Sequence, residues 1–230
     1  MKSLFIALSL SFSITALADT VSQTATGISL DAAWKQQVYD YAKTNVKHPS
    51  WGLTHSERNY QVSLDLAAKE GIVIDRDVLF VSAFLHDLGG IAGHEAEGVD
   101  HAVRSVELIE PLLVQWKFPM QKFEQVKEMI LGHTYYGEKP KSLQAQVFRD
   151  ADILDFLGTI GVARILAIAQ EPGRSDGTLN PPVSILKSFS KSMAGKCSLQ
   201  ACVRMAEPRK NELDQFLQSL DLQSFGGKAL

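Results

Sequence analysis

The segment LFVSAFLHDLGG, residues 79–90, constrains the fold of this chain more than any other. Its apolar residues predict a buried helix, and the run ends at His86 and Asp87, which precede two glycines. Neighbouring helix positions do not share a face, so these two side chains can converge only where the helix ends or is distorted. Gly89 and Gly90 favour such an ending. The sequence therefore predicts a helix whose end presents a His-Asp pair.

Most of the remaining chain has apolar residues at helical spacing, and we find no run typical of a strand and no internal repeat. Thr54 and Glu57 have the spacing of a capping box at the start of a helix. Residues 88–99 contain four glycines and predict a loop. The predicted fold class is an all-α helical bundle. The expected helices cover approximately residues 31–47, 54–69, 75–87, 100–113, 119–133, 142–157, 159–169, 184–194 and 209–220.

The first residues of the chain have the pattern of a secretory signal peptide, residues 1–18. A short positive start precedes an apolar run, and Ala16-Leu17-Ala18 is a small-x-small cleavage site. The run is shorter than the roughly 20 apolar residues that a membrane anchor needs. We therefore expect export across the inner membrane to the periplasm, without stable membrane insertion.

The two cysteines, Cys197 and Cys202, are five residues apart. An oxidising compartment would favour a disulfide between them. This bond would distort a continuous helix but would close easily in a loop or a broken helix. The alternative is a pair of reduced, partly buried thiols. The net charge of −3 gives no electrostatic basis for binding a nucleic acid duplex, and the sequence leaves the oligomeric state open.

Histidine and aspartate residues recur at helical segments far apart in the chain. His55 lies 31 residues before His86, and Asp152 lies 65 residues after Asp87. Two imidazoles and two carboxylates can meet around one divalent cation, and this set of donors suits Mn, Fe, Co, Ni, Zn or Mg rather than a thiophilic metal. We predict that these four residues are metal ligands. The alternative is that they are ordinary caps and solvated helix positions.

This order of residues, H…HD…D, resembles the HD superfamily of metal-dependent phosphohydrolases. The resemblance covers about residues 50–165 and rests on HSER at 55–58, HDLGG at 86–90 and DADILDFLG at 150–158. In HD proteins the last ligand is the Asp of an AD-x-L segment, which is Asp152 here, rather than Asp150 or Asp155. The resemblance implies a helical bundle that hydrolyses a phosphoester with metal-bound hydroxide as the nucleophile, and Asp87 as a catalytic residue.

The same resemblance implies a second set of residues. In several HD subfamilies, including the HD-GYP type, two further histidines complete a second metal site, and here these would be His101 and His133. The protein would then bind one divalent ion or two, with Asp87 as the bridging ligand. Alternatively, both histidines lie around a single ion as outer donors or substrate contacts. Asp155, three residues after Asp152, is expected to orient a ligand histidine.

Two cations are candidates for substrate binding. Arg58 shares a helix face with His55, and HxxR is part of the family pattern, so we expect it to bind phosphate with its planar fork. A surface ion pair with Glu57 or Asp65 is the alternative. Lys139 is a second candidate for phosphate binding. The expected partner is a small phosphorylated substrate of open identity.

The resemblance also suggests how the chain is divided. We expect a flexible leader at 19–30, the HD domain at 31–170 and a C-terminal helical extension at 171–230 that packs on the same domain. The chain lacks the Glu that follows the HD pair in some nucleotidase branches, and it lacks a GYP triplet after this pair. Three alternatives remain: a di-iron oxygenase resembling inositol oxygenase, a hydratase resembling cyanamide hydratase, and a non-catalytic metal- or ligand-binding module.

Overall fold

The computed structural model describes residues 22–168 and 176–230. In these two ranges the regular structure is helical, apart from an isolated bridge between Gln23 and Ser29, so the prediction of an all-α fold is confirmed. The predicted signal peptide lies outside the described residues. No helix in the described ranges is long and apolar enough to cross a membrane.

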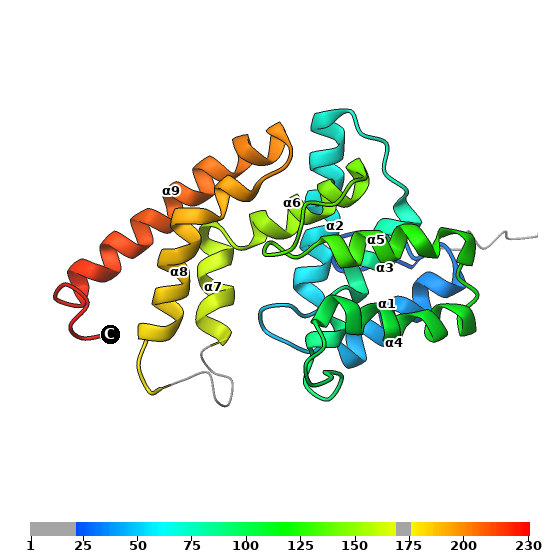
Figure 1. Cartoon of the computed structure of the whole chain (residues 1–230), viewed down its shortest axis with the longest axis horizontal. Helices are drawn as coiled ribbons and strands as arrows, with labels where there is room; N and C mark the ends of the chain where they lie inside the picture. Colours follow the sequence, from blue (N-terminus) through cyan, green and yellow to red (C-terminus); the bar gives the residue numbers. More distant parts are fainter. Residues whose placement is uncertain (1–21, 169–175) are drawn as a thin grey trace, which may run out of the picture.

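The helices form two groups that meet at α6 (Figure 1). The first group surrounds one hydrophobic core, and the second surrounds another. The first group contains α1 (Ala33–Asn45), α2 (Leu53–Glu70), α3 (Arg76–Leu85), η1 (Leu88–Gly90), α4 (His101–Gln115), η2 (Met120–Lys122), α5 (Phe123–Gly132) and α6 (Leu143–Asp155). The second contains α7 (Gly158–Ile168), α8 (Asn180–Ser192), η3 (Ala194–Lys196) and α9 (Gln200–Gln223), which also packs on α6 and α2.

The helix α3 lies in the centre of the first group and packs against α1, α2 and α5. Asp75 begins it by accepting hydrogen bonds from the backbone N–H groups of Asp77 and Val78. Every residue from Val78 to Leu85 is buried, and the helix ends with His86 as its C-terminal cap. The predicted end of the helix at the His-Asp pair is therefore confirmed.

Gly89 is required where the chain leaves α3. A Cβ atom at this position would lie 2.4 Å from the carbonyl oxygen of His101 and 2.6 Å from the backbone nitrogen of Ser105. Only glycine lets the η1 turn come so close to the start of α4. Ser105 fixes the contact, because its hydroxyl accepts from the N–H of Gly89 and donates to the carbonyl of His86. The His-Asp pair is thus held against α4.

The start of α2 differs from the prediction. The helix begins at Leu53 after Gly52, so Thr54 lies inside the helix and the capping box is absent. The carboxylate of Glu57 instead accepts hydrogen bonds from the Thr24 hydroxyl and the Thr26 N–H. These two distant donors replace the local capping contact, because the buried carboxylate of Glu57 can accept a hydrogen bond from each of them.

The expected flexible leader also needs correction for its described part, residues 22–30. Ile28 and Leu30 are buried in the core of the first group, and the segment is tied to α2 through Glu57. Residues 19–21 lie outside the described residues. The Ser/Thr-rich composition favoured the prediction of a flexible segment, but burial of two apolar side chains is sufficient to pack this short segment against the core.

The C-terminal helices are longer than expected. The helix α8 starts at Asn180 rather than near residue 184, and α9 covers Gln200–Gln223 rather than 209–220. Pro208 lies inside α9, where a proline typically costs about 3 kcal/mol. Burial of Ala206 and Leu213 on either side of it stabilises the continuous helix.

Candidate metal centre

The predicted ligand residues meet at one place although they come from five helices. They are His55 on α2, His86 and Asp87 at the end of α3, His101 at the start of α4, His133 at the end of α5, and Asp152 on α6. Four of these positions are helix ends, where a side chain can leave the helix surface and reach a common centre.

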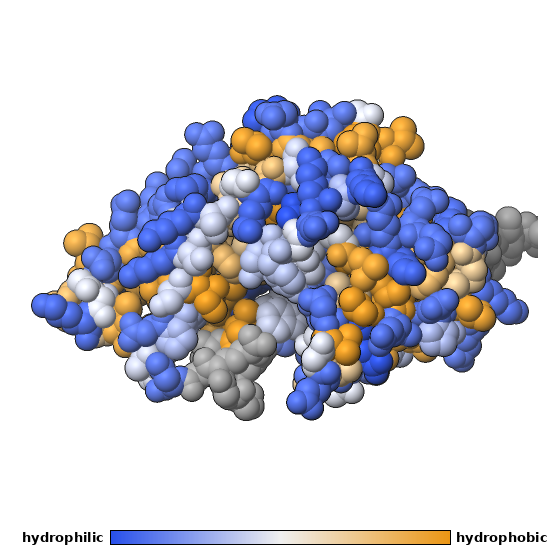
Figure 2. Space-filling view, in the orientation of Figure 1, coloured by the Kyte–Doolittle hydropathy of each residue, from blue (hydrophilic) through white to orange (hydrophobic). Residues whose placement is uncertain are grey.

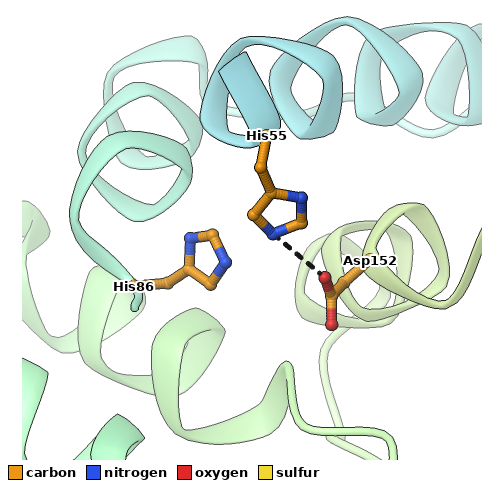
Figure 3. Close-up of side chains that lie close together, drawn as sticks. All are labelled: His55, His86 and Asp152. Atoms are coloured by element: carbon orange, nitrogen blue, oxygen red, sulfur yellow. Dashed lines mark ion pairs between the residues drawn. The ribbon is translucent and has the colours of Figure 1, made fainter. Parts of the chain in front are cut away.

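His55, His86 and Asp152 form the first part of the centre (Figure 3). One ligand atom from each residue lies within 4.8 Å of those of the others, and His55 Nε2 is 3.3 Å from Asp152 Oδ1. The Nδ1 atom of His86 lies 3.1 Å from the carbonyl oxygen of Ala83, which can accept a hydrogen bond from an Nδ1–H group. The Nε2 atom of His86 is buried and makes no hydrogen bond. A buried acceptor directed at this cluster fits a metal ion.

Asp87 lies between this first part of the centre and a second part, which contains His101 and His133. Its Oδ2 atom lies 3.1 Å from His86 Nε2 and 3.6 Å from His55 Nε2. Its Oδ1 atom lies 3.3 Å from His101 Nε2 and 3.5 Å from His133 Nε2. Each carboxylate oxygen thus faces a different pair of imidazoles. This is the arrangement expected of a carboxylate that bridges two cations.

The outer nitrogens of three histidines are occupied by hydrogen-bonding partners. His55 Nδ1 lies 2.7 Å from Asp155 Oδ2, His133 Nδ1 lies 2.5 Å from the carbonyl oxygen of Ile130, and His101 Nδ1 lies 3.1 Å from the Tyr136 hydroxyl. Acceptors at Nδ1 favour a proton there on His55 and His133. His55 Nε2 also lies 3.1 Å from the side-chain nitrogen of Asn59, and His133 Nε2 lies 3.2 Å from His101 Nε2, so a metal ion would take the place of these contacts. The structure places the Asp155 carboxylate against His55, and its orienting role stays a prediction.

The electrostatic environment keeps the central acids ionised. Burial raises the pKa of Asp87, but interactions with the imidazoles of His86, His101 and His133 outweigh it, so this pKa lies well below its usual range. Burial also raises the pKa of Asp152, and its contacts with His55 reverse the shift. Burial lowers the pKa of His86, which favours a neutral imidazole. Burial also lowers the pKa of His55 and His133, but contacts of His55 with Asp152 and Asp155, and of His133 with Asp87, outweigh it and raise both pKa values. A metal ion would therefore have to displace protons from these two imidazoles.

Asp155 lies behind His55 and pairs with two arginines. Arg58 donates to it from Nε and Nη2, both at 2.9 Å, and Arg164 Nη1 lies 3.1 Å from Oδ2. Burial raises the pKa of Asp155, but hydrogen bonds from His55 and Arg58 together with the Arg164 charge hold it far below its usual range. The carboxylate therefore stays charged and fixes the orientation of His55.

The two predicted substrate cations do not line the cavity beside the centre. The guanidinium of Arg58 is directed at Asp155, and Lys139 is exposed in the loop after α5. Their contacts with phosphate remain predictions that the structure does not support. Asp150 also points away from the centre and accepts from the backbone N–H groups of Ser198 and Leu199. This agrees with the choice of Asp152 as the ligand of this segment.

A cavity of about 380 Å³ opens beside the Asp87 carboxylate. Arg164 of α7 reaches it and is 4 % exposed, with Nη2 3.4 Å from His55 Nε2. The sequence interpretation missed this residue. The sequence does contain an indication of Arg164, because it is a single charged residue within the strongly apolar segment 159–169. A charge in such a segment predicts a buried cation that is paired with an acid. The cavity is lined by Trp51, Asp87, Gly90, His101, His133, Thr134, Tyr135, Tyr136, Asp152, Phe156, Arg164, Ile165, Ile168, Ile185 and Phe189.

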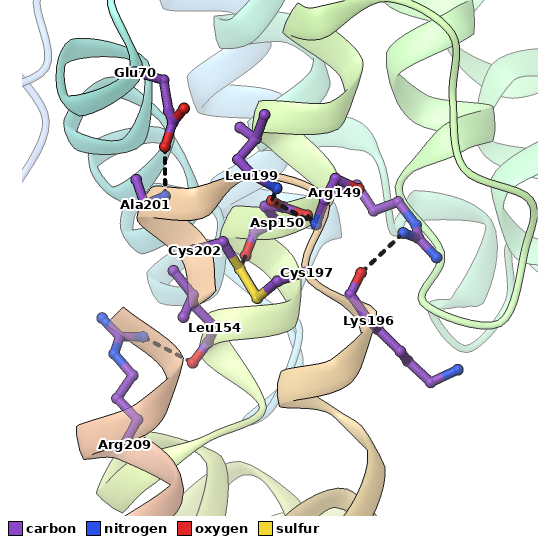
Figure 4. Close-up of a disulfide and its surroundings, with 11 residues drawn as sticks. Glu70, Arg149, Asp150, Leu154, Lys196, Cys197, Leu199, Ala201, Cys202 and Arg209 are labelled. Carbon is purple, nitrogen blue, oxygen red and sulfur yellow. Dashed lines mark hydrogen bonds between the residues drawn. A yellow bond between two sulfur atoms is a disulfide. The ribbon is translucent and has the colours of Figure 1, made fainter. Parts of the chain in front are cut away.

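A disulfide links the segment that follows η3 to the first turn of α9 (Figure 4). Cys197 and Cys202 are bonded across the break between η3 and α9, which is the geometry that the sequence spacing allowed. Arg149 donates to the carbonyls of Lys196 and Tyr135, and Lys196 Nζ donates to the same Tyr135 carbonyl. The disulfide segment therefore holds the loop after α5, which lines the cavity.

Comparison with known proteins places this geometry in a family. The model of the HD domain matches residues 52–157. A curated relative from Clostridium beijerinckii, an uncharacterized protein, is 28 % identical over 89 residues, which are 39 % of this chain and 54 % of the relative. The match thus spans about half the length of that relative.

Solved structures share the fold. YpgQ from Bacillus subtilis in complex with ADP matches with a TM-score of 0.62 at 19 % identity, covering 83 % of this chain and 94 % of YpgQ. A predicted HD superfamily hydrolase from an uncultured Thermotogales bacterium matches with a TM-score of 0.54 at 23 % identity, covering 82 % and 91 % of the two chains. Residues 52–157 of this chain are therefore an HD domain.

Proposed function

We propose that this protein is a metal-dependent hydrolase of small phosphoesters. The observation that carries the proposal is the position of Asp87, whose two oxygens face two separate pairs of imidazoles at the edge of a cavity. His55, His86 and Asp152 would hold one divalent cation, and His101 and His133 a second, with Asp87 shared. A divalent cation supplies charge neutralisation and acidifies a water molecule at neutral pH.

The residues around the cluster suit attack on a phosphate. Arg164 is the buried guanidinium that lines the cavity, and it would neutralise the non-bridging oxygens in place of Arg58. Arg58 would act through Asp155 by keeping His55 oriented. In the reaction, the oxygen of water forms a bond to phosphorus, the ester P–O bond breaks, and the proton of water passes to the leaving oxygen.

Other observations support a phosphorylated ligand and an exported protein. YpgQ, which shares the fold, binds ADP, a phosphate-bearing molecule. The sequence pattern of residues 1–18 and the bonded cysteines both favour an oxidising compartment, which we propose is the periplasm.

The test compares hydrolysis of p-nitrophenyl phosphate by the purified protein with Mn, Fe, Co, Ni, Zn and Mg. Asp87→Ala and His86→Ala should lower both the turnover and the bound metal to background. Asp65→Ala, on the exposed face of α2, is the matched control and should change neither. Full activity of Asp87→Ala would refute the mechanism.

The same preparation separates the alternatives. A mixed-valence iron spectrum would favour the oxygenase, and release of urea from cyanamide would favour the hydratase. Absence of turnover with any metal, together with a ligand-induced rise of the melting temperature, would favour a binding module.

A further inference from the structure

The lining of the cavity beside the candidate metal centre contains two unlike sets of residues. The first set, called the charged end here, contains the carboxylates of Asp87 and Asp152 and the guanidinium of Arg164. The second set, called the apolar end, consists of side chains that contain no hydrogen-bonding atom, which are Phe156, Ile165, Ile168, Ile185 and Phe189. A ligand that contacts both sets needs a charged group and an apolar group.

Four of the five residues of the apolar end lie on helices outside the matched HD segment, and Phe156 lies inside it. Ile165 and Ile168 are three residues apart on α7, and Ile185 and Phe189 are four apart on α8, so each pair lies on one helix face. The space-filling view shows hydrophobic residues of α7 and α8 beside a hollow between the two groups of helices (Figure 2). Apart from Phe156, the apolar end thus belongs to the C-terminal helices rather than to the matched segment.

The aromatic part of the wall is preformed. The rings of Tyr135, Phe156 and Phe189 meet edge to face, with centroids 5.1 to 5.6 Å apart. Arg164 lies over the Phe156 ring at 4.5 Å and joins this wall to the charged end. Ile165 and Phe189 are buried, while Ile185 is 38 % exposed at the cavity opening. An apolar group would find a fixed surface here.

We propose that the substrate is a phosphomonoester whose alcohol is an aromatic or branched aliphatic group, seated on the wall formed by α7 and α8. This inference rests on the hydrolase function proposed above and specifies its substrate class. Hydrolysis would release inorganic phosphate and an apolar alcohol, with the alcohol oxygen accepting the electron pair of the broken P–O bond and a proton from water.

The test compares 1-naphthyl phosphate with glycerol 3-phosphate on the metal-loaded protein. The kcat/KM for the naphthyl ester should be at least about tenfold higher, because burial of the ring adds binding energy that glycerol lacks. Ile185→Asn should lower the kcat/KM for the naphthyl ester about three- to tenfold, mainly through KM, and leave glycerol 3-phosphate unchanged. Ile160→Asn is the matched control, because Ile160 is 40 % exposed on α7 and does not line the cavity.

Binding of the non-hydrolysable 1-naphthylmethylphosphonate and methylphosphonate, measured by calorimetry, separates the two proposals. Tighter binding of the naphthyl compound, lost in Ile185→Asn, supports the apolar end even if neither ester is hydrolysed, an outcome that would refute only the hydrolase function. Hydrolysis of both esters at equal kcat/KM, with Ile185→Asn indistinguishable from Ile160→Asn, would overturn the inference and leave the hydrolase function standing.

Discussion

Replacement of Asp155 by asparagine tests how the centre is held together. The side chain keeps its size but loses the charge that pairs with Arg58 and Arg164. Arg164 is 4 % exposed, and removing one partner of a buried ion pair typically costs about 3–5 kcal/mol. The Arg58 side chain is 29 % exposed, so solvent screens its pair and we add at most about 1 kcal/mol for it. The free energy of unfolding should therefore fall by about 3–6 kcal/mol.

The same substitution should weaken metal binding. Asp155 holds the Nδ1 proton of His55, and loss of such an outer partner typically lowers metal affinity about 10- to 100-fold. Urea unfolding of the metal-free protein measures the stability, and competition with a chelator measures the affinity. Asp65→Asn breaks an exposed pair with Lys69 on the same helix as His55 and should change stability by less than about 1 kcal/mol. A metal affinity within twofold of that of the original protein would refute the orienting role of Asp155.

The pH dependence of stability provides a second measure. The pKa of Asp155 in the folded protein lies below that of the unfolded chain, about 3.9. Its contribution is therefore fully present above the unfolded pKa and is lost as the pH falls from there toward the folded pKa. Asp155→Asn should flatten the acid limb of the stability profile in that range, while Asp65→Asn should leave the limb unchanged.

Three further substitutions test other parts of the structure. His101→Ala should remove one of two bound ions and leave the ion at His55, and unchanged metal stoichiometry in mass spectrometry would contradict the second site. Gly89→Ala should lower the melting temperature and weaken metal binding, because a Cβ there lies 2.4 Å from a backbone oxygen of α4; a melting temperature equal to that of the original protein would show that η1 can move away. Serine at Cys197 and Cys202 should cost about 2 kcal/mol in urea unfolding, since the bond closes a loop of only five residues' separation, and an unchanged midpoint would contradict this.

The sequence predicted the parts of the centre that local patterns determine. The glycines after Asp87 indicate where α3 ends, and the AD-x-L segment distinguishes Asp152 from Asp150, which lies two residues away and turns toward α9. These inferences needed only helix geometry and the family order of ligands. They also led to the prediction that Asp155 orients a histidine, because positions three residues apart lie on a similar helix face.

The features that depend on distant packing could not be predicted. Arg164 reaches His55 only because Gly158 turns the chain at a φ of 69° between α6 and α7, and no local pattern gives the angle that follows. The capping prediction at Thr54 failed for a related reason, since Glu57 finds its partner at Thr24, 33 residues away. The division of roles between the two arginines also becomes visible only when Arg164 of α7 reaches Asp155 of α6.

Metal stoichiometry is the most direct measure of whether Asp87 bridges two cations. The protein would be loaded with Mn²⁺, passed through a desalting column and measured by elemental analysis and native mass spectrometry, together with Asp87→Ala. Two ions per chain in the original protein and none in Asp87→Ala are the predicted result. Equal metal content in the two proteins, or no retained ion in the original, would contradict the assignment of these histidines and aspartates to a metal centre.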